Sequence, residues 1–151
     1  MKALSTSFRK KQQGWSFQVI HDFCRKSDCP DGYAPAAGLI ADVNGNIYGV
    51  TLGGGTGIHG CGVAFELLAP NWKFKTLHSF CASDGDGDEP SAALSYFGKA
   101  AGAFYDGVSP LYGVTDEGGA QGGGNGVHAA AQRRQMERNA SLRFLRGPAM
   151  S

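Results

Sequence analysis

Two stretches of this chain carry the same pattern of residues. Residues 15–24 read WSFQVIHDFC and residues 72–81 read WKFKTLHSFC, while residues 47–51 (IYGVT) return as residues 111–115 (LYGVT). Both of the later motifs lead into clusters of glycines. The spacing of about 57 residues between the copies indicates one supersecondary unit used in tandem, and such units bury a core only by stacking on their neighbours. The chain is therefore expected to be a repeat protein.

Each copy begins with a strand-like run. Residues 15–23 and 72–80 alternate between apolar and polar side chains and are rich in aromatic and β-branched residues. This pattern is typical of a strand with one buried face. Residues 62–68 (GVAFELL) predict a further strand that leads into the second copy.

A hairpin is expected in the middle of each copy. Asn44-Gly45 separates the apolar runs 38–42 and 46–51, and both of these residue types tolerate the positive φ of a type I′ turn. The second copy has more residues at this point, so residues 97–110 are expected to form an extended hairpin tip.

These elements add up to about four short antiparallel strands per repeat, which is the content of a propeller blade. We therefore expect an all-β fold of tandem four-stranded repeats, propeller-like, with a β-solenoid as the alternative. A closed propeller needs typically four to eight blades, so two repeats would make an incomplete one. Its open strand edges predict oligomerisation or poor solubility.

Composition excludes several classes of protein. The formal net charge is +1, which gives no electrostatic reason to expect binding to nucleic acid. No run of about 18 apolar residues is present, so no membrane span is predicted. The 24 glycines have no three-residue period, which argues against collagen. Residues 1–13 are basic but lack the apolar core of a secretory signal, so as encoded a cytoplasmic location remains an alternative.

Four cysteines allow two interpretations. Cys24 and Cys29 bracket a short polar loop and could close a small disulfide ring, or they could be ordinary thiols in a reducing compartment. A zinc site is not favoured, because Cys61 and Cys81 do not form the second short hook that zinc motifs use.

The repeated positions resemble the GloVer tandem repeat of bacterial "choice-of-anchor" proteins. In the first copy the matching residues are Trp15, His21, Phe23, Pro35, Gly38, Leu39, Gly45, Asn46, Tyr48, Gly49, Thr51, Gly53, Gly54, Gly62, Val63 and Phe65. In the second copy they are Trp72, His78, Phe80, Pro90, Leu94, Tyr112, Gly113, Thr115, Gly118, Gly119, Gly126 and Val127. The resemblance implies a fragment of a longer exported, surface-associated repeat array, extracytoplasmic and without a cofactor, whose partners are other β-repeats or surface glycans. No established activity comes with this repeat.

The expected organisation is an N-terminal extension at residues 1–13, a repeat region at 14–127 that divides into 14–71 and 72–127, and a basic tail at 128–151. The tail departs from the repeat pattern. It is rich in arginine and alanine, which suits an irregular or helical segment or a basic arm. Our preferred hypothesis is a shifted reading frame, because codons can be chosen for this segment whose neighbouring frame restores the repeat pattern.

Three acidic residues, Asp84, Asp86 and Asp88, alternate with glycine. Calcium loops use acidic oxygens at alternate positions, but the rest of the EF-hand pattern is missing, so a solvated turn is the simpler interpretation.

His21 and His78 occupy the same repeat position. A residue that recurs at one structural position is usually a packing or hydrogen-bonding element, and no nucleophile is placed to complete a catalytic triad. The repeat-signature aromatic residues could stack on sugars, although residues that recur once per repeat more often fill the core between units. This signature consists of Trp15, Trp72, His21, His78, Tyr48, Tyr112, Gly49 and Gly113.

The expected function is therefore non-enzymatic, with a structural or surface-interaction role. The alternative is a carbohydrate- or calcium-dependent binding module that uses the polar loops after Cys24 and Cys81. A hydrolase that uses His21 or His78 is the weakest hypothesis.

Overall fold

A computed structural model of the chain describes residues 17–57, 59–124 and 126–129. The predicted extension 1–13, Trp15 and residues 130–151 of the tail lie outside the described residues. The elements in chain order are β1 (Ile40–Ala41), β2 (Ile47–Thr51), β3 (Val63–Leu68), β4 (Lys73–Ser79), β5 (Gly87–Asp88), β6 (Ser95–Tyr96), the 3-10 turn η1 (Lys99–Ala101), β7 (Leu111–Val114), β8 (Glu117–Gly118) and β9 (Gly126–Ala129). The prediction of an all-β chain is confirmed for this part of the sequence.

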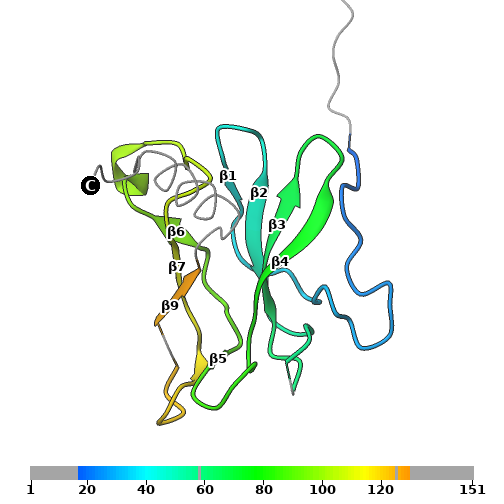
Figure 1. Cartoon of the computed structure of the whole chain (residues 1–151), viewed down its shortest axis with the longest axis vertical. Helices are drawn as coiled ribbons and strands as arrows, with labels where there is room; N and C mark the ends of the chain where they lie inside the picture. The colour runs from blue at the N-terminus through cyan, green and yellow to red at the C-terminus, as the bar shows by residue number, and fades with distance from the viewer. Residues whose placement is uncertain (1–16, 58, 125, 130–151) are drawn as a thin grey trace, which may run out of the picture.

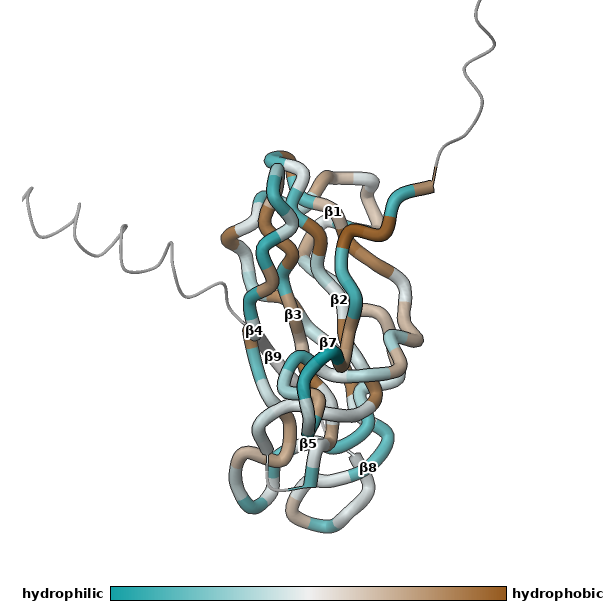
Figure 2. The backbone as a smooth tube through the Cα atoms, turned by 90° about the vertical axis from the view of Figure 1, so that its right-hand side faces the viewer, coloured by the Kyte–Doolittle hydropathy of each residue, from teal (hydrophilic) through white to brown (hydrophobic). Residues whose placement is uncertain are grey.

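The first sheet is antiparallel, with the strand order β1-β2-β3-β4. It joins the hairpin of the first sequence copy to the tryptophan run of the second. Figure 2 shows β4 alternating between hydrophilic and hydrophobic residues beside a more uniformly hydrophobic β3. The burial agrees, because β3 is almost wholly buried while β4 is partly exposed along its length.

The second sheet has the order β6-β7-β9, and a separate pair is formed by β5 and β8. Strands β6, β7 and β9 occupy the same positions in their copy as β1, β2 and β3 do in theirs. The two sheets stand side by side (Figure 1). Both are open, and the described strands form no closed ring, so the propeller-like arrangement is not supported.

One predicted strand is missing. Residues 17–23 form no strand, although their counterpart in the second copy is β4. The reason lies in pairing: β4 receives its backbone hydrogen bonds from β3, the strand before it, and no described strand precedes residue 17. These residues instead reach the first sheet through side chains, with the ring of Phe23 5.2 Å from that of Phe65 and 6.0 Å from that of Phe74.

The turn between β1 and β2 also differs from the prediction. Gly45 has a φ of 81°, but Asn44 is not among the residues with positive φ, so the turn is not type I′. The Gly45 N–H donates to the carbonyl of Asp42, and the Asp42 N–H donates to the carbonyl of Asn46. This is a tight turn followed by a left-handed glycine, the arrangement of a three-residue hairpin loop with a bulge. The carboxylate of Asp42 fixes it by accepting the N–H groups of Asn44 and Asn46.

The extended tip at 97–110 lies where the sequence places it, between β6 and β7, and contains η1. It folds against the first sheet: the Val43 N–H donates to the carbonyl of Tyr105, and the Tyr105 and Tyr48 rings meet edge to face at 5.0 Å. The tip therefore ties the two sheets together.

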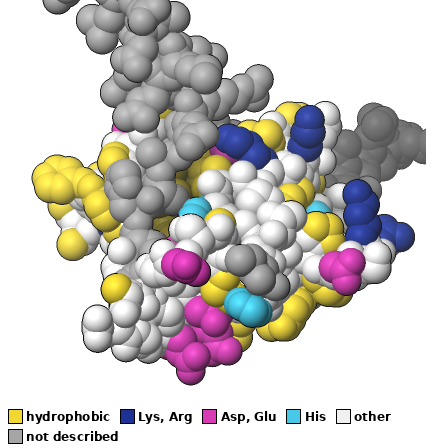
Figure 3. Space-filling model, turned by 60° about the horizontal axis from the view of Figure 1, so that its bottom comes forward, with side chains coloured by type: hydrophobic (Ala, Val, Ile, Leu, Met, Phe, Trp, Pro, Cys, Tyr) yellow, Lys and Arg dark blue, Asp and Glu magenta, His cyan; other side chains and the backbone are white. Residues whose placement is uncertain are grey.

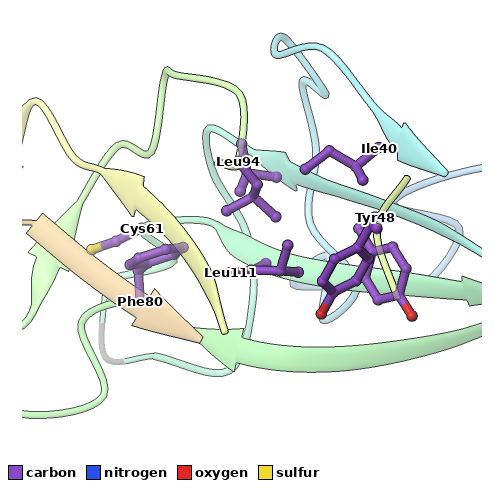
Figure 4. Packing of buried hydrophobic residues seen from close by; sticks show 9 residues of the cluster. Ile40, Tyr48, Cys61, Phe80, Leu94 and Leu111 are labelled. Carbon is purple, nitrogen blue, oxygen red and sulfur yellow. The ribbon is translucent and has the colours of Figure 1, made fainter. Parts of the chain in front are cut away.

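The core lies between the two sheets (Figure 4). Buried apolar side chains from both sheets and from the tip share one cluster, which consists of Ile40, Tyr48, Val50, Cys61, Ala64, Phe80, Leu94, Tyr105 and Leu111. Neither sheet could bury this area alone, so the hydrophobic contribution to stability comes from their stacking.

Candidate functional site

A histidine–aspartate pair lies near the start of the first sequence copy. The Nε2 atom of His21 lies 2.9 Å from Oδ2 of Asp31, and the N–H of Cys24 donates to Oδ1 of the same carboxylate. The His21 ring also meets the ring of Phe23 edge to face at 4.6 Å. Asp31 therefore connects the end of the polar loop 24–31 back to its start. The disulfide between Cys24 and Cys29 lies within this loop.

The second copy repeats the arrangement. The Nε2 atom of His78 lies 3.1 Å from Oδ2 of Asp86, whose carboxylate also accepts the N–H groups of Ala82 and Gly87. The His78 ring meets that of Phe80 edge to face at 4.8 Å. Sequence reasoning placed the two histidines correctly in register but missed their carboxylate partners. The signal was available, because each loop ends in Asp-Gly.

Further backbone features repeat with the pair. Cys24 and Cys81 both have left-handed φ values, 59° and 56°. In each copy a threonine hydroxyl near the end of the central strand donates to a carbonyl two residues later, in Thr51 and in Thr115. A Cβ atom on Gly32 would collide with the first of these threonines, and one on Gly87 with the second. The two loops are thus built to the same plan.

The remaining cysteines form a bridge that the sequence did not suggest. Cys61 and Cys81 are joined by a disulfide and lie beside Asp88, with the candidate ligand atoms of the three residues within 4.8 Å of one another. Two sulfurs bonded to each other supply no thiolate, so this group is not a metal site in its oxidised form.

The three aspartates considered for calcium have different environments. Asp86 accepts hydrogen bonds from His78 and the loop, Asp88 pairs with Glu117 in the β5–β8 ladder, and Asp84 is exposed on the turn. Among the described residues, the carboxylates of these three aspartates do not all lie within 4.8 Å of one another.

A cavity of about 460 Å³ opens beside the first histidine. The ring of His21 stacks on that of Phe74 at 4.8 Å and forms part of its wall. The other lining residues are Asp22, Arg25, Lys26, Pro30, Asp31, Thr56 and Thr76. Figure 3, which brings the bottom of the molecule forward, shows histidine side chains among acidic and apolar ones. The cavity thus combines charges of both signs, two hydroxyls and aromatic rings.

A second polar cluster is buried between the sheets. The Tyr48 hydroxyl lies 2.8 Å from Oε1 of Glu66 and 3.1 Å from Oδ2 of Asp42, and Lys75 reaches the other oxygen of Glu66 at 3.2 Å. Burial raises the pKa of Asp42, but hydrogen bonds from Asn46, Asn44 and Tyr48 outweigh it and hold this pKa below its ordinary value. Burial, the hydrogen bond to Glu66 and the nearby negative charges raise the pKa of Tyr48. This cluster was not predicted from the sequence.

The repeat-signature residues have different environments. Tyr48 is fully buried, whereas Tyr112 is half-exposed, and Trp72 is partly buried with a left-handed φ of 53°. Gly49 is required by packing, because a Cβ atom there would meet Leu39 and Phe65 at 2.7 and 2.8 Å. Gly113 holds the same position in β7.

Comparisons with protein-family models, with curated proteins and with solved structures find no match for this chain. The resemblance to the GloVer repeat therefore rests on the sequence motifs alone. Within the described residues, no helix has the length and apolar character needed to cross a bilayer.

Proposed function

We propose that this chain is a non-enzymatic β-repeat protein with a structural or surface-interaction role. The observation that carries the proposal is the recurrence of the histidine–aspartate pair. In both copies the carboxylate binds the histidine and the loop backbone, through one N–H group in the first copy and two in the second. A group used in the same way in each repeat serves the architecture of the repeat.

The surroundings of the histidines support this role. A general base must reach the proton of a nucleophile, and a triad needs a third residue to orient the base. The nearest hydroxyl in sequence to His78 is Ser79, whose oxygen accepts the N–H groups of Thr56 and Gly57. The Ser79 hydroxyl therefore stabilises the backbone of the glycine-rich loop that contains Thr56 and Gly57.

Two disulfides among the described residues support a location outside the cytoplasm, because disulfides persist in oxidising compartments. This agrees with the exported, surface-associated array that the sequence resemblance implies. In such an array the chain would be one part of a longer series of stacked repeats.

The test is to remove one carboxylate charge from a loop. Asp86→Asn should lower the free energy of unfolding by about 1–3 kcal/mol, because hydrogen bonds to the histidine and two N–H groups are weakened. Asp84→Asn is the matched control, since Asp84 is exposed in the same loop and a surface change should stay within about 0.5 kcal/mol. Urea unfolding followed by circular dichroism measures both. If Asp86→Asn were as stable as the unaltered protein, the architectural role would be rejected.

The cavity beside His21 favours a second function, the binding of a carbohydrate. Arg25, Lys26 and Asp31 offer charged donors and acceptors, and Thr76 offers a hydroxyl. A glycan array probed with the protein would test it, with Arg25→Ala as the cavity variant and Lys73→Ala, on β4 but outside the lining, as control. Signals that persist in Arg25→Ala would place glycan binding elsewhere. A calcium-dependent rise in melting temperature that Asp88→Asn abolishes would add calcium to this second function.

A further inference from the structure

Two cysteines and an aspartate from separate parts of the chain meet at the edge of the core. Cys61 precedes β3, Cys81 follows β4 and Asp88 lies on β5. The two sulfurs and a carboxylate oxygen of Asp88 all lie within 4.8 Å of one another. Cys61 is 4% exposed and lies beside Phe80 in the buried cluster (Figure 4), while Cys81 and Asp88 are only partly buried. The core therefore closes one side of this group, and solvent reaches the other.

Backbone hydrogen bonds hold the three residues together independently of the sulfur–sulfur bond. On one side of Asp88, the Cys81 N–H donates to the carbonyl of Gly87. On the other side, the Glu89 N–H donates to the carbonyl of Cys61. Because neither bond involves a sulfur atom, we expect a chain with this disulfide reduced to keep both thiols beside the carboxylate of Asp88.

These side chains form a ligand set suited to zinc. Sequence spacing does not favour zinc at Cys61 and Cys81, but the pairing of β3 with β4 brings the two cysteines together. Thiolates and carboxylates both bind Zn²⁺, and tetrahedral bonds of about 2.0–2.3 Å place the ligand atoms less than about 4 Å apart. Small rotations of side chains whose ligand atoms already lie within 4.8 Å reach this separation. Three protein ligands leave the fourth position to water, on the side that solvent reaches.

We propose that reduction of the Cys61–Cys81 bridge converts this group into a zinc-binding site with Cys61, Cys81 and Asp88 as its ligands. A dithiol reductant supplies the two electrons and two protons that turn the bridge into two thiols, and it is itself oxidised to a disulfide. Each thiol then releases its proton to solvent as its sulfur binds the ion. This inference goes beyond the proposed function, because it concerns the chain in a reducing environment.

The experiment uses the full chain with Cys24→Ala and Cys29→Ala, so that Cys61 and Cys81 are the only cysteines. We call this protein the two-cysteine chain. It is reduced with a phosphine, because a dithiol would itself bind metal, and the phosphine is removed in the absence of oxygen. The probe is Co²⁺, whose bonds to thiolates give charge-transfer absorption. Circular dichroism shows whether each sample is folded.

Two variants of the two-cysteine chain test the carboxylate. Asp88→Asn removes the charge of the third ligand. Asp84→Asn is the matched control, because Asp84 is exposed on the turn before β5. A sample of the two-cysteine chain that keeps the disulfide intact tests the requirement for reduction.

The reduced two-cysteine chain should bind one Co²⁺ with thiolate charge-transfer absorption, and Zn²⁺ should displace it because thiolate ligands favour zinc. The oxidised sample should show no such absorption. Asp88→Asn should bind Co²⁺ at least about 10-fold more weakly, because losing a ligand should cost no less than losing one of the groups that orient ligands. Asp84→Asn should bind as the two-cysteine chain does. Zn²⁺ should also raise the melting temperature of the reduced protein, since the assembled site exists only in the folded chain.

Three results would overturn the proposal. A reduced two-cysteine chain that binds no Co²⁺, whether it is folded or unfolded, would exclude the site. Equal affinities for Asp88→Asn and Asp84→Asn would remove the carboxylate from it. An affinity that is unchanged in concentrated urea would show that the thiols bind metal without the folded framework. The stability of Asp86→Asn is measured with both disulfides intact, so none of these results bears on the structural role.

Discussion

Replacing Tyr48 with phenylalanine should destabilise the protein by about 2–3 kcal/mol. The ring is fully buried, and its hydroxyl is the group that lies between two buried carboxyl side chains, at 2.8 Å from Glu66 and 3.1 Å from Asp42. A hydrogen bond to a charged group contributes about 1.5–3 kcal/mol. Asp42 keeps three other hydrogen bonds from Asn44 and Asn46, so the loss falls mainly on Glu66 Oε1.

A loss of this size is easily measured, because a domain of this length is stable by about 5–15 kcal/mol. With a urea m-value of about 1.5 kcal/mol/M, a change of 2 kcal/mol moves the midpoint by about 1.3 M. Tyr33→Phe is the matched control, because Tyr33 is half-exposed and the unfolding midpoint of this variant should barely move. If Tyr48→Phe fell within about 0.5 kcal/mol of the unaltered protein, the energetic account of this cluster would be refuted.

The same variant gives a second, independent signal in alkali. The pKa of Tyr48 is raised in the folded state by burial, by its hydrogen bond to Glu66 and by nearby negative charge. The corresponding stability is fully present below the unfolded pKa of about 10 and is lost as the pH rises above it. Because phenylalanine does not titrate, the difference in stability between the two proteins should shrink above pH 10.

Three further predictions concern other parts of the fold. Removing the long-range bridge with Cys61→Ala and Cys81→Ala together should cost about 3 kcal/mol, measured by urea unfolding without reductant, and an unchanged midpoint would argue against the bridge. Gly32→Ala should lower the free energy of unfolding by more than Gly102→Ala, for which backbone strain of about 1 kcal/mol is expected. Both glycines have positive φ, but only at Gly32 would the new methyl group collide with its neighbours. Equal losses in thermal unfolding would contradict this. In acid, the stability that depends on Asp42 is present above a pH of about 4 and is lost as the pH falls through the lowered pKa of the folded state. Between pH 5 and 2, Asp42→Asn should therefore lose less free energy of unfolding than the unaltered protein. Parallel losses in the two proteins would refute the assignment.

Local patterns in the sequence predicted the elements whose partners are close in the chain. The β1–β2 hairpin, the strand at β3 and the long tip before β7 all follow from alternation and turn residues within about 15 positions. The run at 17–23 has the same alternation as β4 and yet forms no strand, because alternation marks a possible strand and hydrogen-bonded pairing makes one. The type of the first turn was missed because the side chain of Asp42, outside the Asn-Gly pair, selects it.

The Cys61–Cys81 bridge could have been found from the register of a predicted hairpin. Val63 pairs with Ser79 in β3 and β4, so two more positions outward on each strand place the two cysteines opposite one another. The Phe80 N–H donates to the carbonyl of Gly62 and continues this ladder as far as the bridge. The contact between Tyr48 and Glu66 follows from register in the same way, because these residues pair in β2 and β3. The burial of this cluster had no such signal, because it depends on the second sheet packing over Tyr48.

The two Tyr-Gly-Val-Thr motifs have the same local sequence, so comparing them shows which features depend on that sequence and which depend on packing between the sheets. Thr51 and Thr115 make the same hydrogen bond to a carbonyl two residues later, so the turn that follows each central strand is a property of the motif. The tyrosines of the same motifs have opposite environments, one within a buried hydrogen-bonded cluster and the other half-exposed. Identical local sequence cannot produce this difference, so it must come from the presence of a neighbouring sheet on one side. The motif therefore carries the information for the turn that follows it, while the burial of its tyrosine depends on the sheet that packs against it.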